Sequence, residues 1–418
     1  MIDYLLDWGS LLLRWLHVVA GIAWIGSSFY FVWLDNHLEP TKEAEEKDSG
    51  VAGHLWAVHG GGFYRSQKYR VAPRELPSTL HWFYWEAYTT WLSGFALLSL
   101  LYLLRAEAYL IDPAVAPLSK PTAIAIALGV LVVSWLTYDL LCRSPLGRND
   151  RALGAVLAAL AALLAWGLCQ LFSGRGAFML FGAALGTIMV ANVLFVIIPG
   201  QRELVRAKRE GREPDPTPGL RGKQRSVHNT YFTLPVVFVM ISNHYAMTYG
   251  GRYNWVTLIA LSFAGACTRV WFVARHKPEG RHGWLAALPA ALAVGTIVAL
   301  IAVLAPSRTA TPTELAARAG ATLGAPAQEH LPPEVDAAVV SAIVSQRCVP
   351  CHATRPTQVG FNAPPNGIVL ENLDELRAHL PEVQKQLALR TMPLGNLTRM
   401  TDEERAAVLM WIGHGAAH

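Results

Sequence analysis

Long apolar stretches are the feature of this sequence that most limits its fold. Of the 418 residues, 53% are hydrophobic, and they are concentrated in blocks. Each block is close to the roughly 20 residues that a helix needs to cross a bilayer. Because lipid offers no hydrogen-bonding partner to a bare backbone, we expect each block to form a helix. The sequence predicts eight transmembrane helices, at 9–34, 80–104, 121–142, 152–172, 177–198, 229–248, 254–275 and 283–305.

The loops between these blocks differ strongly in their content of basic residues. Loops one, three, five and seven contain 20 Lys and Arg residues, whereas loops two, four and six contain 4. The positive-inside rule therefore places the odd-numbered loops in the cytoplasm and both chain termini in the periplasm of a bacterial inner membrane. The formal net charge of +5 follows from this asymmetry. We therefore expect the protein to be embedded in a lipid bilayer and do not expect it to bind nucleic acid.

A cysteine motif near the end of the chain predicts a covalent cofactor. Cys348-Val349-Pro350-Cys351-His352 has the C-x-x-C-H spacing of c-type haem attachment. The two thiols would form thioethers to haem c, and the adjacent His352 would bind its iron. A bare C-x-x-C could instead be a redox pair, which the histidine disfavours, or half of a zinc site. No second cysteine pair completes a zinc site, since the remaining cysteines lie upstream in apolar segments, at Cys142, Cys169 and Cys267.

The sequence around this motif, 336–418, resembles a class I cytochrome c domain. Met392 precedes Pro393 in a short loop and is the expected second axial ligand of the iron. Met400 is the rival ligand, but it has no following proline and adjoins a predicted helix cap. That cap is a capping box, in which Thr401 begins a helix and Glu404 follows three residues later.

The domain organisation follows from the spans and the haem motif. We expect an all-α fold, in which a membrane domain of eight transmembrane helices at 1–305 precedes the cytochrome c domain. Residues 306–335, rich in Ala, Thr and Pro, are predicted to be a flexible linker. Haem c is attached outside the bacterial cytoplasm, so the motif and the basic loops independently place the C-terminal domain in the periplasm.

Polar residues inside the predicted spans are candidate functional residues because they are costly in lipid. His17, one turn from Arg14, lies near the periplasmic side, at a depth similar to that of Asn243 and His244 on the sixth span. His17 and His244 could ligate a haem b, or they could bind a quinone or the substrate. A layer nearer the cytoplasm contains His81, Glu86, Asp139, Asn192, His228, Asn229 and Arg269.

Several of these residues have simpler interpretations. Asp139 and Arg269 lie at similar depth and could neutralise one another. His81 at a span end could be an interfacial anchor. In loop one, His59 could be solvated, and the glycine run at 60–62 could either present backbone N–H groups to an anion or form a turn.

Three motifs carry a resemblance to a known family. They are Leu16 to Gly26 (LHVVAGIAWIG), His81 to Gly94 (HWFYWEAYTTWLSG), and Leu234-Pro235 with Ser242 to Tyr245 (SNHY). Together with the appended cytochrome, they resemble the membrane-bound bacterial urate hydroxylases. The resemblance implies that the protein oxidises urate to 5-hydroxyisourate and passes electrons to its haem. A periplasmic cytochrome c or a terminal oxidase would then accept them.

Urate is a flat anion, so its site needs a cation or N–H donors, an aromatic ring and a base. The candidate bases are His81, Glu86 and His59. The candidate cations for the anion are Arg269 and Arg14. Electrons would leave through the layer of His17 and His244.

Two other functions fit the same sequence. One is a quinol–cytochrome electron carrier with haem or quinone between these histidines, and the other is a haem sensor or tethered cytochrome with a structural membrane part.

Overall fold

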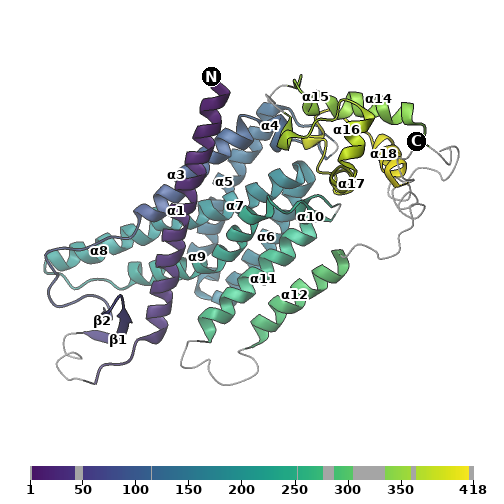
Figure 1. The fold of residues 1–418 in the computed structure, drawn as a ribbon. Helices are drawn as coiled ribbons and strands as arrows, with labels where there is room; N and C mark the ends of the chain where they lie inside the picture. The colour runs from purple at the N-terminus through teal and green to yellow at the C-terminus, as the bar shows by residue number, and fades with distance from the viewer. Residues whose placement is uncertain are drawn as a thin grey trace.

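The computed structural model of the protein describes residues 2–42, 50–113, 115–251, 253–275, 287–304, 335–358 and 364–413. Most of these residues are helical (Figure 1), as expected. A β-hairpin in the first loop is an exception to the all-α expectation: β1 (Val51–His59) pairs antiparallel with β2 (Gly62–Tyr69). Gly60 and Gly61 connect the strands at positive φ (55° and 82°), which glycine adopts readily. The glycine run is therefore a hairpin turn.

The N-terminal part of the chain is a bundle of long helices. They are α1 (Ile2–His37), α3 (Trp85–Leu98), α5 (Lys120–Arg143), α6 (Asp150–Leu171), α7 (Gly174–Asn192), α8 (Ile198–Arg209), α9 (Thr217–Ser242), α11 (Asn254–Ala274) and α12 (Leu288–Leu304). Two π-helical turns, η1 (Ser99–Leu103) and η3 (Val193–Ile197), follow α3 and α7. Short elements complete the bundle: α4 (Ala106–Tyr109), the 3₁₀ turn η2 (Pro145–Arg148) and α10 (Ala246–Tyr249).

Five helical segments in the described part of the chain are long and apolar enough to cross a membrane. They are Trp8–His37, Lys120–Arg143, Asp150–Leu171, Gly174–Arg209 and Asn254–Ala274. These segments correspond to the first, third, fourth, fifth and seventh predicted spans. α12 is apolar but has 17 residues, and α9 begins with a polar stretch. The count of eight spans therefore stays a prediction.

Two helices differ from the predicted spans at one end, and both differences relocate a candidate residue. The second span was expected from residue 80, but α3 begins at Trp85, so His81 precedes the helix. α9 ends at Ser242, so His244 lies in the following turn and is exposed. The predicted depths assumed uninterrupted helices, and this assumption is wrong at both places.

Side-chain caps fix where three of the long apolar helices begin. Ser119 accepts a hydrogen bond from the backbone N of Thr122 (3.4 Å) at the start of α5. Asn149 accepts from the N of Ala152 (3.1 Å) at α6, and Ser173 from the N of Gly176 (3.1 Å) at α7. Each cap satisfies a backbone donor that the first helical turn leaves without an intrahelical partner.

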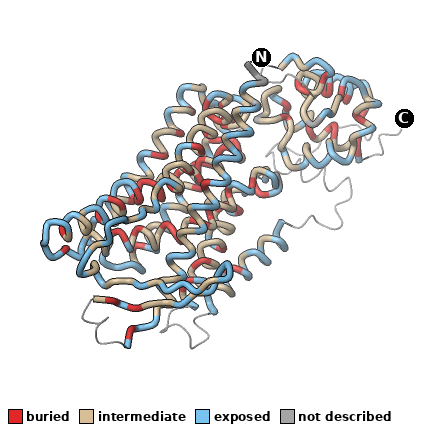
Figure 2. The backbone as a smooth tube through the Cα atoms, turned by 60° about the vertical axis from the view of Figure 1, so that its left-hand side comes forward, coloured by how far each residue is buried: buried red, intermediate tan, exposed pale blue. Residues whose placement is uncertain are grey.

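α7 is the central helix of the bundle. Phe178, Leu180 and Phe181 are at most 2% exposed, and α7 contacts α3, α5, α6 and α9. Buried segments accordingly concentrate inside the bundle in Figure 2. By contrast, α1 exposes large apolar side chains such as Leu11 and Trp15. An apolar outer face of this kind suits a helix that packs against lipid.

The C-terminal residues 335–413 form a second helical unit with its own hydrophobic core. Its helices are α14 (Ala337–Arg347), α15 (Val349–His352), α16 (Leu373–Ala378), α17 (Leu380–Ala388) and α18 (Asp402–Gly413). The predicted capping box is confirmed, since Thr401 N donates to Glu404 Oε2 (2.8 Å) and Glu404 N donates to Thr401 Oγ1 (3.2 Å). The predicted linker lies outside the described residues apart from Val335.

The C-terminal unit lies at one end of the helical bundle. Its 3₁₀ turn η7 (Leu394–Asn396) contacts α4, and Figure 1 shows the β-hairpin near the opposite end. α4 belongs to the second predicted loop, which the basic-residue asymmetry places in the periplasm. The structure therefore brings together two parts of the chain that the sequence predicts on the same side.

Candidate functional site

The two cysteines of the C-x-x-C-H motif lie one helical turn apart where α14 meets α15. The carbonyl oxygen of Cys348 accepts hydrogen bonds from the backbone N of Cys351 (3.1 Å) and of His352 (2.9 Å). Neither sulfur is in a disulfide. Burial raises the pKa of both thiols, that of Cys348 to about 12. Burial therefore favours the neutral thiol form of both side chains.

His352 has a defined ring orientation. Its Nδ1 lies 2.9 Å from the carbonyl oxygen of Ile368. Because a carbonyl oxygen can only accept, Nδ1 carries the proton and Nε2 keeps a free lone pair. Metal-binding histidines generally donate their other ring N–H in this way, which fixes the tautomer. Nε2 of His352 is therefore available as an iron ligand.

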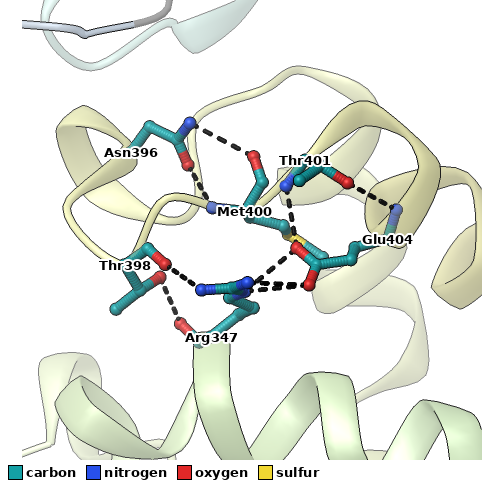
Figure 3. A network of polar contacts seen from close by, with 6 residues as sticks. All are labelled: Arg347, Asn396, Thr398, Met400, Thr401 and Glu404. Carbon is teal, nitrogen blue, oxygen red and sulfur yellow. Dashed lines mark hydrogen bonds and ion pairs between the residues drawn. The ribbon is translucent and has the colours of Figure 1, made fainter.

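The two methionines that could provide the second ligand have different environments, and Figure 3 shows that of Met400. Met400 is 3% exposed and belongs to the core of the C-terminal unit, and Asn396 bonds its backbone N (2.9 Å) and O (3.2 Å). Met392 is half-buried in a loop, and its carbonyl oxygen accepts from Nη1 of Arg405 (2.6 Å). Because the side chain of Met400 is buried in the core of the C-terminal unit, the half-buried Met392 is favoured as the ligand.

No group of three or more His, Cys, Asp or Glu side chains gathers in the described ranges. A His/Met haem requires one side chain of each type, so the C-terminal motif is a different kind of site.

A buried polar network links α5, α7 and α9 inside the bundle. Asn192 is fully buried and donates Nδ2 to Tyr138 Oη (3.1 Å) and to Asn229 Oδ1 (2.8 Å). Tyr138 Oη also forms a hydrogen bond with Nδ1 of His228 (2.8 Å), and Asn229 donates to the carbonyl oxygen of Met189 (2.9 Å). Polar groups that lie so deep in an apolar bundle are costly unless they are paired, and here they pair with one another.

Arg225 connects this network to a carboxylate. It is 3% exposed, and its Nη2 donates to Oδ1 of Asp139 (2.8 Å) while its guanidinium lies 4.9 Å from the ring centre of Tyr138. Asp139 also pairs with Nε of Arg143 (2.6 Å). The expected pairing of Asp139 with Arg269 is therefore wrong. Similar depth did not make these two residues neighbours, because α5 packs on α7 whereas α11 packs on α9 and α12.

A cavity of about 650 Å³ lies beside Arg225, between α5, η2, η3, α8 and α9. We call it the arginine cavity. Phe195 of the π-helical turn η3 forms an apolar part of its wall and stacks on Trp135, with ring centres 5.9 Å apart. π-Helical turns often occur at functional sites. The charged residues that line the cavity are Arg143, Arg148, Arg221, Arg225 and Glu203.

The helical bundle of the chain matches a described protein family. Residues 3–303 match the model of the family "Urate oxidase N-terminal". The chain belongs to the urate oxidase N-terminal family. The match ends before the C-terminal unit and contains the buried network and the arginine cavity. No curated protein and no solved structure matches the chain. Membership makes the protein a relative of oxidoreductases that act on urate.

Within this urate oxidase N-terminal region, the four predicted catalytic residues come from three different places in the chain: β1, the segment that leads into α3 together with the first turn of α3, and α11. His59 is exposed at the end of β1, His81 is exposed ahead of α3, and Glu86 is half-buried in the first turn of α3. Arg269 on α11 is 8% exposed. In the parts of the chain that are described, no hydrogen bond or ion pair joins any two of them. Their catalytic roles stay predictions.

Arg269 has an unusual environment. Its guanidinium lies 3.6 Å from the ring centre of Phe29 on α1, and its buried Nε has no hydrogen-bond partner in the described structure. A cation over an aromatic face is a recognised favourable contact. This contact links α11 to α1, which is a structural role that the residue already fulfils.

The predicted histidine layer is also rearranged. Nδ1 of His17 on α1 lies 2.9 Å from the carbonyl oxygen of Thr90 and 3.1 Å from Oγ of Ser93, both on α3. His244 is exposed in the turn after α9, and Arg14 is exposed on α1. Among the described residues, no recorded interaction connects His17 with His244. A haem b between them stays a prediction.

Sequence reasoning missed Arg225 as a site residue. It was counted among the basic residues of loop five because the sixth span was drawn from residue 229. α9 in fact begins at Thr217, so Arg225, His228 and Asn229 all lie on this helix. Their spacing of three and four residues places them on one face. That spacing was the signal in the sequence.

Proposed function

We propose that the protein is a membrane-bound urate hydroxylase, which oxidises urate to 5-hydroxyisourate and passes the electrons to a haem c on its own C-terminal domain. From there the electrons would go to a periplasmic cytochrome c or a terminal oxidase. One observation carries the proposal. A urate oxidase N-terminal region is joined in one chain to a domain in which His352 offers a free Nε2 beside two neighbouring thiols.

The residues of the C-terminal domain fit a haem c. Cys348 and Cys351 would form the thioethers, His352 would bind the iron through Nε2, and Met392 would be the second protein ligand. When bound, the haem supplies a one-electron acceptor. Ile368 holds the tautomer of His352, and Arg405 holds the backbone of the Met392 loop.

The net reaction defines what the membrane domain must provide. The urate monoanion loses two electrons and one proton, and one water molecule adds at C5, which balances atoms and charge. The proton must pass to a base, and the anion must be held by cations or N–H donors in a site with limited access to bulk water. Tyr138 and His228 share a hydrogen bond inside the bundle, and we propose this pair as one route for that proton. The sequence-predicted bases remain the alternatives: His81, Glu86 and His59.

We infer that the membrane domain lies in a bacterial inner membrane with its odd-numbered loops in the cytoplasm. Supporting this, α4 and the C-terminal domain lie at one end of the bundle, and the β-hairpin of loop one lies near the other (Figure 1). Phosphatase and fluorescent-protein fusions near Asp215 and after Ala305 are expected to report opposite sides of the membrane. Reports from the same side would contradict the eight-span arrangement.

The reaction is tested with purified, oxidised, full-length protein and urate in the absence of oxygen. We expect the haem α-band to rise, with one urate reducing two haems because each haem accepts one electron. Reduction by quinol but not by urate would favour the electron carrier instead. Reduction by neither would favour the sensor or tethered cytochrome. The Cys348→Ala, Cys351→Ala double variant is the control, and it is expected to lack a haem stain on a denaturing gel.

A further inference from the structure

The arginine cavity has an excess of positive charge. Four arginines and one glutamate line it. The carboxylate of Glu203 pairs with Arg206 and also with Nη2 of Arg212 (3.4 Å), and neither of these arginines lines the cavity. Of the lining arginines, Arg148 and Arg221 have exposed side chains, and within the described part of the chain neither forms an ion pair with a carboxylate within 4 Å. The cavity is therefore suited to an anion.

Arg225 provides a preorganised donor at the inner end of the cavity. Its side chain is 4% exposed, and Asp139 holds one of its terminal nitrogens at 2.8 Å. Behind it, Asn192 and Tyr138 begin the buried network that leads to His228. A buried arginine is expensive to keep within a membrane protein, and such residues usually serve a binding site or an ion path.

The remaining walls favour a flat ligand with amide-like edges. Phe195 presents an aromatic ring, and its stack on Trp135 restricts its movement. Gln224 donates its Nε2 to the carbonyl oxygen of Gly147 (2.8 Å) and to Asp150 (2.9 Å), so that its Oε1 remains an acceptor. The volume of about 650 Å³ is within the range of small-molecule sites.

We propose that the arginine cavity is the urate-binding site of the membrane domain, where Arg148 and Arg221 recruit the anion, Arg225 orients it and Phe195 stacks on its ring. This proposal rests on the proposed function. In the inferred topology the cavity opens on the cytoplasmic side. The buried network behind it then provides the hydrogen-bonded groups of Tyr138 and His228 within reach of the site's inner end.

An anionic lipid headgroup has the same charge as urate and is the competing source of an anion at this depth. The two differ in shape, because a headgroup phosphate needs arginines but no aromatic wall. Phe195 therefore discriminates between them. Loss of that ring weakens the binding of a planar purine anion and leaves the binding of a phosphate unchanged.

The experiment measures binding of labelled urate by equilibrium dialysis to the full-length holoprotein after reduction of its haem, since a reduced protein cannot turn over the ligand. We expect Arg148→Gln and Arg221→Gln each to weaken binding by about ten- to a hundredfold, as for loss of a charge-assisted hydrogen bond. Phe195→Leu is expected to weaken it several-fold. Arg209→Gln, the same charge change on the exposed face of α8 outside the cavity, is the matched control and is expected to bind like the parent.

A second arm repeats the measurement in nanodiscs with and without phosphatidylglycerol. Competition of this lipid with urate, together with unchanged urate affinity of Phe195→Leu, would overturn the proposal in favour of a headgroup site. Parent-like urate binding by both Arg148→Gln and Arg221→Gln would also overturn it. So would a result in which Glu86→Gln and Arg269→Gln lose urate binding while the cavity variants keep it.

The outcomes separate this site from the proposed function. A parent protein that binds urate in the cavity but is not reduced by it would support the site and reject urate oxidation. A parent that is reduced by urate, with cavity variants of equal activity and affinity, would support urate oxidation and reject the site.

Discussion

The imidazole ring of His17 lies directly against Gly94. A methyl group on Gly94 would be 2.8 Å from Cε1 and 3.2 Å from Nδ1 of this ring. The same ring is held by the carbonyl oxygen of Thr90. We expect Gly94→Ala to displace the ring and to lower stability by about 1–3 kcal/mol, as overpacking does. This net loss already includes the gain of about 1 kcal/mol that alanine brings over glycine in helix propensity. Thermal unfolding in detergent, followed by tryptophan fluorescence, measures the change.

Gly26→Ala is the matched control for this substitution. Gly26 lies on α1, and no atom lies within 4 Å of a methyl group placed on it. We expect Gly26→Ala to unfold at the same temperature as the parent protein or at a slightly higher one. A Gly94→Ala protein as stable as the Gly26→Ala protein would show that α1 and α3 do not pack as described.

Local spacing in the sequence predicted local structure well. Thr401 and Glu404 form a capping box as expected, because both halves of the motif depend only on residues three positions apart. The apolar blocks likewise predicted α5, α6, α7 and α11 to within a few residues, apart from polar residues at their ends. The hairpin around Gly60 and Gly61 also had a local signal, but it was overlooked in a segment interpreted as a polar loop.

Partners across the bundle could not be predicted in the same way. The depth of a residue along a span gives its height in the membrane but not the direction in which it faces. Depth therefore suggested Arg269 as a possible partner of Asp139, whereas the actual partner, Arg225, comes from a segment counted as a loop. The arginine cavity depends on such lateral neighbours, so the sequence alone did not indicate it.

The different environments of Met392 and Met400 predict different effects of substitution. We expect Met392→Ala to keep the covalent haem, to lower its reduction potential and to remove the weak sulfur-to-iron absorbance. Met400→Leu is the control, because it preserves the volume of a side chain that is 3% exposed in the core. It is expected to change neither property. Potentiometric titration and absorbance spectra of both variants check this, and the reverse pattern would identify Met400 as the ligand.

Glu404 makes the stability of the C-terminal domain depend on pH. Its carboxylate accepts from Nε (2.9 Å) and Nη2 (2.8 Å) of Arg347 (Figure 3), and these bonds hold the pKa of Glu404 below its ordinary value of 4.5. A lowered pKa means that the stabilisation is present above pH 4.5 and is lost as the pH falls through the lower folded-state value. We expect Glu404→Gln to cost about 1–2 kcal/mol at pH 7 and less in acid.

Hydrogen exchange of the α18 amides in the full-length protein measures this cost without relying on the haem. Glu382→Gln, an exposed change of the same kind in α17, is the control and is expected to be silent at every pH. A Glu404→Gln effect that stays constant from pH 7 down to pH 4 would show that the side chain stabilises α18 by packing and not by its charge.

The last prediction concerns the contact between the C-terminal domain and the membrane domain. η7, which directly follows Met392 and Pro393, contacts α4. Ser173 holds α4 firmly, because its Oγ donates to the carbonyl oxygen of Tyr109 (2.8 Å) and its N donates to that of Leu110 (2.9 Å). The loop that carries Met392 therefore contacts a part of the bundle that is itself held by hydrogen bonds, and we propose that electrons pass between the two domains in this docked arrangement.

We expect cysteines at Ala108 in α4 and Leu394 in η7 to be joined by a short bis-maleimide in membranes. With a protease site inserted in the predicted linker, the two halves of the cut protein should then stay together on a denaturing gel. Glu210→Cys at the far end of α8, combined with Leu394→Cys, is the control and is expected to release them. The cross-linked protein should still be reduced by urate at the parent's rate, since the cross-link fixes the docked state. Halves that separate would show that the contact is rarely formed in the membrane, and an intact cross-link with reduction slowed by a hundredfold or more would show that electron transfer requires the C-terminal domain to leave α4.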